Sequence, residues 1–238
     1  MGLAFLVSLT AACFHDDSDG GGASSGGCAD AEKNLDATSK TATYCVTFSA
    51  HWTKKDFSEV PDNAHFTDIV GAAVSPKADM WESGALASAG LEVVAEEGKT
   101  AKYKAELNEA VKADKAANVF VVKGTGATGS RSFEVEVDQD FYAVNFATMV
   151  APSPDWFVGV SEYALMDAAG WIEDSGKVDL KVYDAGTESG KDYSLDNKDT
   201  KPAHPIITLF ETVAGSVDYV DGLVDGNPIA TVKFERIK

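Results

Sequence analysis

The sequence has few basic residues for its length. Twenty Lys and Arg stand against 38 Asp and Glu in 238 residues, which gives a formal net charge of −18. Such a chain cannot easily assemble the basic face that nucleic acid requires, so we expect no nucleic-acid partner. The same deficit argues against direct docking on anionic lipid. Cations and basic partner surfaces are the natural counterparts of this composition.

The sequence also lacks the side-chain patterns of common hydrolytic and metal-dependent enzymes. Its four histidines show neither HExxH nor any other paired metal-ligand spacing. Gly215-Ser216-Val217 lacks the flanking residues of a nucleophile elbow. Because no catalytic constellation is present, we predict a protein that is not an enzyme.

One apparent nucleotide motif lacks the context that its chemistry needs. Residues 124–129 spell GxGxxG after a predicted strand. A dinucleotide site requires a helix to begin there, so that the helix N-terminus faces the pyrophosphate. The residues that follow alternate as a strand instead, so we interpret the segment as a hairpin loop.

No apolar run reaches the roughly 20 residues that span a bilayer. Residues 1–12 are apolar and end in small residues, which is typical of a secretory signal peptide. The sequence up to Cys13 resembles a bacterial lipobox, which predicts lipidation of Cys13 and membrane attachment only through this anchor. Residues 13–40 then contain a tether rich in Gly, Ser and Asp. We expect an exported lipoprotein of the bacterial outer membrane or cell surface; an ordinary cleaved signal is the alternative.

The other two cysteines form an even pair in a chain predicted to be exported. Disulfides persist in oxidising compartments, so a Cys28–Cys45 bridge is expected. It would close a loop of about 17 residues and stabilise the domain by about 3 kcal/mol. The alternative is two thiols, with Cys45 packed as a small apolar residue.

Strand patterns dominate the remaining chain, residues 41–238. Residues 41–52 alternate with Tyr44, Val46, Phe48, Ala50 and Trp52 on one face. In residues 132–137, Phe133, Val135 and Val137 form the predicted core face. Further strands are predicted over residues 91–95, 118–122, 141–150, 156–160, 178–183, 206–210 and 229–237. About eight or nine short strands separated by Gly, Pro, Asp and Asn indicate an antiparallel β-sandwich.

One segment has helical periodicity. Residues 100–117 are rich in Ala, Lys and Glu, and Tyr103, Leu107 and Val111 recur at i, i+4 and i+8. This spacing predicts a single amphipathic helix with an apolar stripe against the sheet.

Two segments carry an unusual chemistry. Residues 151–160 read APSPDWFVGV, and residues 184–190 read DAGTESG. Together they resemble the spondin N-terminal family, in which an S-P-D-W-F-x-G segment precedes a D-A-G-T-[DE]-S-G loop. Further pieces match in order, among them residues 44–48, 61–71, 81–84, 87–90 and 95–98, and Trp171. The resemblance covers about residues 41–238. Val74 departs from it, since family members often have His there.

The resemblance implies a C2-like β-sandwich with a divalent-cation site, Ca²⁺ by preference, to which Asp155, Asp184 and Glu188 supply carboxylates. The local chemistry agrees. Pro152 and Pro154 keep the chain extended before Asp155, which we expect at a loop mouth. Gly186 and Gly190 allow a tight loop that directs Asp184 and Glu188 to one point. Ca²⁺ takes six to eight oxygen ligands, so Glu136 is a weaker, fourth candidate.

These features favour a non-catalytic, Ca²⁺-binding adhesion or recognition module displayed on a cell envelope. Its expected partner is a protein or glycan on a surface or matrix. A C2-like domain in which Ca²⁺ bridges acidic loops to phospholipid is one alternative. An envelope hydrolase that uses an acidic pair is another.

Overall fold

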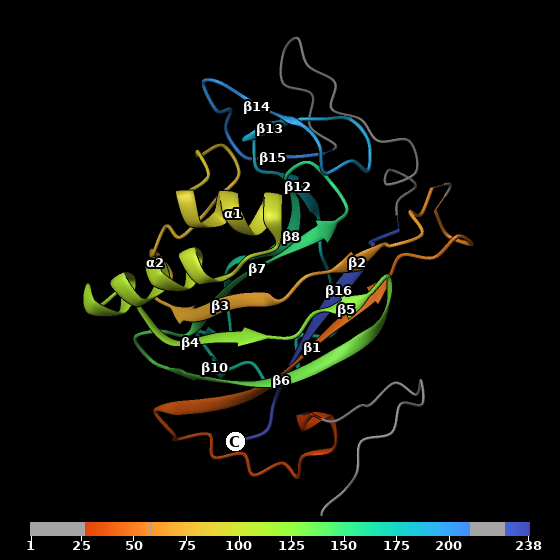
Figure 1. Ribbon diagram of the computed structural model, residues 1–238. Helices are drawn as coiled ribbons and strands as arrows, with labels where there is room; N and C mark the ends of the chain where they lie inside the picture. Colours follow the sequence, from red (N-terminus) through yellow and green to blue (C-terminus); the bar gives the residue numbers. More distant parts are fainter. Residues whose placement is uncertain (1–26, 58, 210–226) are drawn as a thin grey trace, which may run out of the picture.

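The structure is a computed structural model that describes residues 27–57, 59–209 and 227–238. The predicted signal peptide, Cys13 and residues 14–26 of the predicted tether lie outside the described residues. The described chain is mostly β, with antiparallel sheets packed as a sandwich, as the sequence predicts (Figure 1). It has two short α-helices where the sequence predicts one. Neither α-helix is long and apolar enough to cross a bilayer.

The first sheet is built around β1 (Thr41–His51), in the order β11-β16-β1-β6. The flanking strands are β6 (Thr128–Asp138), β16 (Ala230–Arg236) and β11 (Val178–Asp179). The predicted alternation in β1 is confirmed, because Tyr44, Val46 and Phe48 are completely buried. Val135 and Val137 of β6 face the same core.

The second sheet runs in the order β15-β12-β8-β7-β2-β5, and β3 joins it between β7 and β4. Its strands are β2 (His65–Phe66), β3 (Ile69–Val74), β4 (Ala116–Val122), β5 (Thr125–Gly126), β7 (Ala143–Ala151), β8 (Trp156–Ala164), β12 (Val182–Asp184) and β15 (Ile207–Thr208). Every residue of β3 and β7 is buried, because the first sheet covers one face and the helices cover the other.

Smaller elements complete the described chain. They are a 3-10 turn (Cys28–Asp30), the pair β9 (Met166–Asp167) and β10 (Gly170–Trp171), and the pair β13 (Glu188–Ser189) and β14 (Lys198–Asp199). The pair β13–β14 lies at the top of the molecule, beside β12 and β15 and above α1 (Figure 1).

The prediction of a strand at residues 91–95 is wrong. These residues lie in α1 (Ala89–Glu97), where Ser88 Oγ accepts a hydrogen bond from the Leu91 amide at 3.1 Å and Gly98 ends the helix in the left-handed conformation. Leu91, Val94 and Ala95 are buried. The i, i+3, i+4 spacing of these three residues is helical, although Val-Val suggests a strand.

The predicted helix over residues 100–117 is shorter in the structure. It is α2 (Ala101–Lys112), and Ala116 already belongs to β4. Tyr103 and Leu107 are buried as predicted, but Val111 is 40% exposed and Ala110 takes the buried position. Together α1 and α2 form a second core against β3, β7 and β8.

The predicted strand over residues 178–183 is two strands. β11 belongs to the first sheet and β12 to the second, and the Leu180 amide between them donates to the Ala230 carbonyl at 3.0 Å. Strand β3 was not predicted, since its sequence IVGAAV is apolar throughout and does not alternate. No helix begins at residues 124–129, as predicted, but the hairpin interpretation is wrong. The flanking strands do not pair with each other, because β4 pairs with β3 in the second sheet and β6 pairs with β1 in the first, so the segment connects the two sheets.

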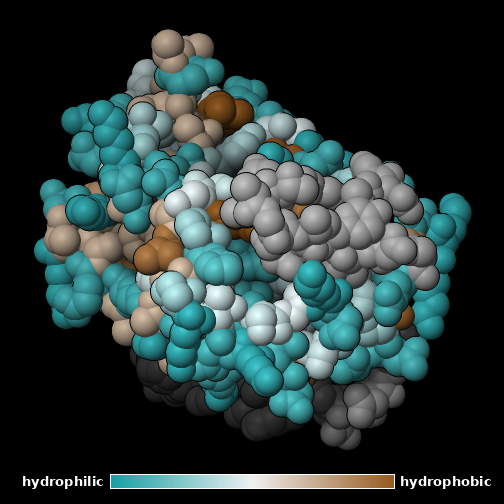
Figure 2. All heavy atoms as spheres, turned by 90° about the horizontal axis from the view of Figure 1, so that it is seen from above, coloured by the Kyte–Doolittle hydropathy of each residue, from teal (hydrophilic) through white to brown (hydrophobic). Residues whose placement is uncertain are grey.

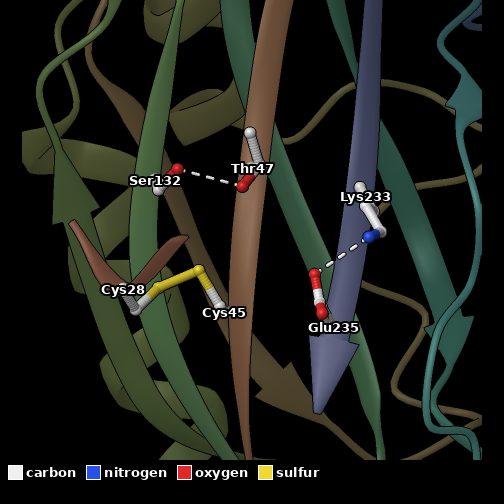
Figure 3. Close-up of a disulfide and its surroundings, with 6 residues drawn as sticks. All are labelled: Cys28, Cys45, Thr47, Ser132, Lys233 and Glu235. Atoms are coloured by element: carbon white, nitrogen blue, oxygen red, sulfur yellow. Dashed lines mark hydrogen bonds and ion pairs between the residues drawn. A yellow bond between two sulfur atoms is a disulfide. The ribbon is translucent and has the colours of Figure 1, made fainter. Parts of the chain in front are cut away.

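The predicted disulfide joins Cys28 and Cys45, with the Cα atoms 5.4 Å apart (Figure 3). It ties the 3-10 turn to the centre of the first sheet. On neighbouring positions, the hydroxyls of Thr47 and Ser132 lie 2.9 Å apart across β1 and β6, and Lys233 pairs with Glu235 at 2.9 Å on β16 (Figure 3).

Candidate metal centre

Asp155 lies immediately before β8 and is completely buried, not at a loop mouth as predicted. The reason is that the loop of residues 184–190 closes over it. Asp155 Oδ2 accepts hydrogen bonds from the Thr187 amide at 2.7 Å, the Glu188 amide at 3.0 Å and the Thr187 hydroxyl at 3.2 Å. The buried carboxylate therefore organises this loop.

Strand pairing brings Asp184 beside Asp155. Asp184 is opposite Trp156 in the β12–β8 ladder, and the Ala185 amide donates to the Asp155 carbonyl at 3.0 Å. Asp184 is 5% exposed, and its Oδ1 accepts from the Gly186 amide at 2.7 Å. The S-P-D-W-F and D-A-G-T-E segments are thus adjacent in space.

Two glycines allow the tight loop, as predicted. Gly186 has a φ of +75°, and a Cβ there would lie 2.2 Å from the His204 carbonyl oxygen. At Gly190 a Cβ would lie 2.4 Å from Pro154 Cγ. Both positions therefore require the absence of a side chain.

Glu188 begins β13 and is partly buried among other carboxylates. The pKa of Glu188 is raised to about 7. Burial is the largest cause, and the negative charges of Glu96, Asp155 and Asp199 add to it. Burial also raises the pKa of Glu96 in the last turn of α1, although a hydrogen bond with Thr187 opposes that rise. Negative charges therefore converge here without full compensation.

Glu96 and Asp199 also belong to this group, although neither was predicted as a site residue from the sequence. Glu96 lies within residues 95–98, a segment matched in the family resemblance, but nothing in the sequence distinguishes it from Glu97. Asp199 is opposite Glu188 in the β13–β14 pair. Its carboxylate bonds to Lys201 at 2.7 Å, which lowers its pKa. We call the five residues Glu96, Asp155, Asp184, Glu188 and Asp199 the acidic cluster.

The structure does not bring Glu136 to this cluster. Glu136 is exposed on β6 in the first sheet, and its carbonyl accepts from Asn118 Nδ2 at 2.9 Å. It is not among the groups that act on Glu188. The other three predicted site residues are together, and Glu136 is apart from them.

The carboxylate oxygens of the acidic cluster suit a hard cation, because such oxygens are the ligands that Ca²⁺ prefers. A carboxylate has about four lone-pair positions, so it can accept hydrogen bonds and bind an ion at the same time. However, no three Asp, Glu, His or Cys side chains in the described ranges are grouped at metal-ligand spacing. The carboxylates of the described residues are therefore not arranged as a preformed metal site.

The end of the sandwich that carries the cluster has a mainly hydrophilic surface with small apolar patches (Figure 2). Both acidic segments fall within residues 42–216, which match the family model described as Spondin_N. This chain belongs to the spondin N-terminal family. Spondin N-terminal domains can bind metal ions.

Several spondins resemble this domain over most of its length. Human spondin-2 is 35% identical over 209 residues, which cover 83% of this chain and 62% of spondin-2. Rat spondin-1 is 32% identical over 204 residues, which cover 77% of this chain and 25% of spondin-1. Chicken spondin-1 is 32% identical over 206 residues. This chain therefore spans about a quarter of the spondin-1 proteins that it matches.

Proposed function

We propose that this spondin domain is a non-catalytic recognition module of the adhesion type, and that its acidic cluster binds Ca²⁺. The observation that carries the proposal is the convergence of Glu96 and Glu188 on the loop that buried Asp155 organises. Burial and like charges there raise the pKa of Glu188 to about 7, which means that its ionised form lacks compensation. A cation supplies that compensation.

Asp155, Asp184 and Glu188 are the proposed ligands, as the family resemblance implies, and Glu96 is an additional one. Bound Ca²⁺ would supply positive charge between loops that otherwise repel each other. Asp155 would continue to hold Thr187 and Glu188 by its hydrogen bonds. The loops at this end would then form a rigid surface for a protein or glycan partner.

The proposal is tested by calorimetric Ca²⁺ titration of the chain, with Tm measured in parallel. An ion that binds only the native state raises Tm with concentration. We expect heat and a Tm increase for the wild type and for Glu136→Gln, and neither for Asp184→Ala. Glu136→Gln is the matched control, because it removes one carboxylate from the other sheet.

A wild type that shows neither heat nor a Tm shift at millimolar Ca²⁺ would refute the proposed site. Equal responses of Asp184→Ala and the wild type would place the ion elsewhere. Ca²⁺-dependent binding to phosphatidylserine vesicles would favour the lipid-surface alternative over a protein or glycan partner, and turnover in a screen of generic hydrolase substrates would contradict a non-catalytic module.

Display on the cell envelope is part of the same proposal. The Cys28–Cys45 disulfide fits an exported domain, because disulfides persist in oxidising compartments. Metabolic labelling with a fatty-acid analogue should mark the wild type and not Cys13→Ser. Label that remains on Cys13→Ser would contradict the predicted anchor.

A further inference from the structure

The glycine-rich segment that does not fit a nucleotide site forms one wall of a different feature. It borders a hollow of about 610 Å³ on the second sheet, between β5 and the connection from β2 to β3. Three of the lining residues are basic in type, although the chain as a whole has a net charge of −18. We call this feature the basic hollow; its polar lining includes His65, Asp68, Lys123, Gly124, Thr125 and Arg131.

The backbone of the glycine-rich segment lies directly against β2. In the β5–β2 ladder, Thr125 is opposite Phe66 and Gly126 is opposite His65. A Cβ on Gly124 would lie 2.1 Å from the carbonyl oxygens of Phe66 and Thr67. Glycine at 124 therefore allows its backbone to approach the backbone of residues 66 and 67 closely, and this backbone lines part of the hollow.

The charges around the hollow are unequally compensated. Lys123 Nζ pairs with Asp68 Oδ2 at 2.9 Å, and the Gly124 amide lies 3.4 Å from Asp68 Oδ1. Arg131 forms no ion pair within the described residues. His65 Nδ1 lies 2.8 Å from the Asn63 carbonyl, to which it donates, so Nε2 is the ring atom left for another partner.

Arg131 is the least compensated of these groups. Its Nε and the Thr125 hydroxyl are buried and have no hydrogen-bond partner among the described residues. The only other arginine in the sequence, Arg236, donates from Nε to the Lys238 carbonyl at 2.8 Å and from a terminal nitrogen to the Asp36 carbonyl at 2.5 Å. A partly buried guanidinium without an acceptor carries a desolvation cost that an anion would offset.

We propose that the basic hollow binds the carboxylate of an acidic sugar. The planar guanidinium of Arg131 offers two parallel donors, which match a carboxylate. Because Nε is covered, the terminal nitrogens meet the ligand first. The hollow is several times larger than a carboxylate, and its backbone, hydroxyl and imidazole groups suit the hydroxyls of a sugar ring. The assignment uses no residue of the acidic cluster and does not depend on Ca²⁺.

The test is an NMR titration of the ¹⁵N-labelled chain in EDTA at constant ionic strength, with glucuronate, glucose, acetate and sulfate as probes. We expect glucuronate to shift the amide signals of residues 124–126 and to bind more tightly than acetate or sulfate, and glucose to cause no shift. Arg131→Gln should weaken glucuronate binding about tenfold, since it removes a charge-assisted hydrogen-bonding group. Lys112→Gln, which removes one exposed positive charge from α2, should leave the affinity unchanged.

Equal affinities of the wild type and Arg131→Gln would overturn the proposal, and so would the absence of glucuronate shifts. Acetate or sulfate binding as tightly as glucuronate would overturn the sugar assignment. If Arg131→Gln does not fold, Lys123→Gln replaces it, because Lys123 is exposed and its removal should weaken binding about twofold to threefold. A Ca²⁺ titration of the same variants in buffer without EDTA separates failure of this proposal from failure of the cation site.

Discussion

The acidic cluster and the basic hollow both lie beside the end of α1, since Glu96 is in its last turn and Gly98 lines the hollow. The uncompensated charge is negative in the cluster and positive in the hollow. In the cluster, buried Asp155 is held by three hydrogen bonds, and repulsion accumulates at Glu188. In the hollow, Arg131 has a buried nitrogen without an acceptor among the described residues. The groups around Glu188 and around Arg131, and not the net charge of −18, therefore determine which charge is left uncompensated in each region.

If this comparison holds, the largest loss of stability comes from Asp155→Ala. The change removes the acceptor of the Thr187 amide and hydroxyl, which are buried, and of the partly buried Glu188 amide, so we expect the free energy of unfolding to fall by about 3–5 kcal/mol. Urea denaturation in EDTA measures it. Asp155→Asn keeps an acceptor and should lose less.

Glu136→Gln is the control for Asp155→Ala, because Glu136 is exposed on the other sheet. We expect it to change the free energy of unfolding by less than about 0.5 kcal/mol. A loss of under about 1 kcal/mol for Asp155→Ala would mean that the loop does not depend on its hydrogen bonds to this carboxylate.

Two glycines, one in each region, test the same difference in the backbone. Gly186→Ala in the cluster loop should destabilise by about 2–3 kcal/mol, because φ is +75° and the new Cβ would collide with the His204 carbonyl. Gly126→Ala in the hollow should cost less than about 0.5 kcal/mol, because the nearest atom to its Cβ is 3.6 Å away. Thermal unfolding of the two variants measures this difference. Similar Tm values would contradict the expectation that the loop cannot accommodate a side chain at position 186.

The sequence predicts those features that depend on local repetition or on a specific motif. Alternation identifies β1 and β6, and the spacing of Cys28 and Cys45 allows the bridge. The motifs around Asp155 and Asp184 correctly predict that these residues are adjacent. The strand prediction for residues 91–95 is wrong because two adjacent valines favour a strand, whereas the packing of Leu91 and Val94 on the sheet favours a helix.

Tertiary contacts explain the other differences from prediction. Glu96 and Glu188 are far apart in sequence, and only the packing of α1 beside the loop brings them together. Asp155 is buried because of residues that follow it much later in the chain, so no local pattern reveals its exposure. The fold class is therefore readable from the sequence, whereas the full set of charges around Glu188 requires the folded chain.

The pH dependence of stability tests the repulsion at Glu188. The pKa of its side chain is about 7 in the folded chain, against 4.5 ordinarily. As the pH rises from 4.5 to 7, Glu188 ionises in the unfolded chain before it ionises in the folded chain. The contribution of Glu188 to the free energy of unfolding is therefore fully present below pH 4.5 and is lost as the pH rises through 7. We expect Glu188→Gln to gain about 1 kcal/mol relative to the wild type between pH 5 and 8 in EDTA, a value reduced by solvent screening.

Urea denaturation at the two pH values, with Glu136→Gln beside it, measures this difference. Ca²⁺ should reverse the order at pH 8, since the ion stabilises the ionised wild type and requires a deprotonated ligand. A Glu188→Gln variant that follows the wild type at both pH values would show that the carboxylate is already compensated.

The smallest expected effect is that of Arg131→Gln on stability without ligand. Arg131 Nε makes no hydrogen bond that the change could remove, so we expect the free energy of unfolding to change by less than about 0.5 kcal/mol. Arg236→Gln is the matched comparison and should cost about 2–4 kcal/mol, because its guanidinium bonds to two backbone carbonyls. Glucuronate should then raise the Tm of the wild type and of Arg236→Gln, and raise that of Arg131→Gln less at the same concentration. A large loss for Arg131→Gln without ligand would instead make this arginine a structural residue, compensated as fully as Asp155.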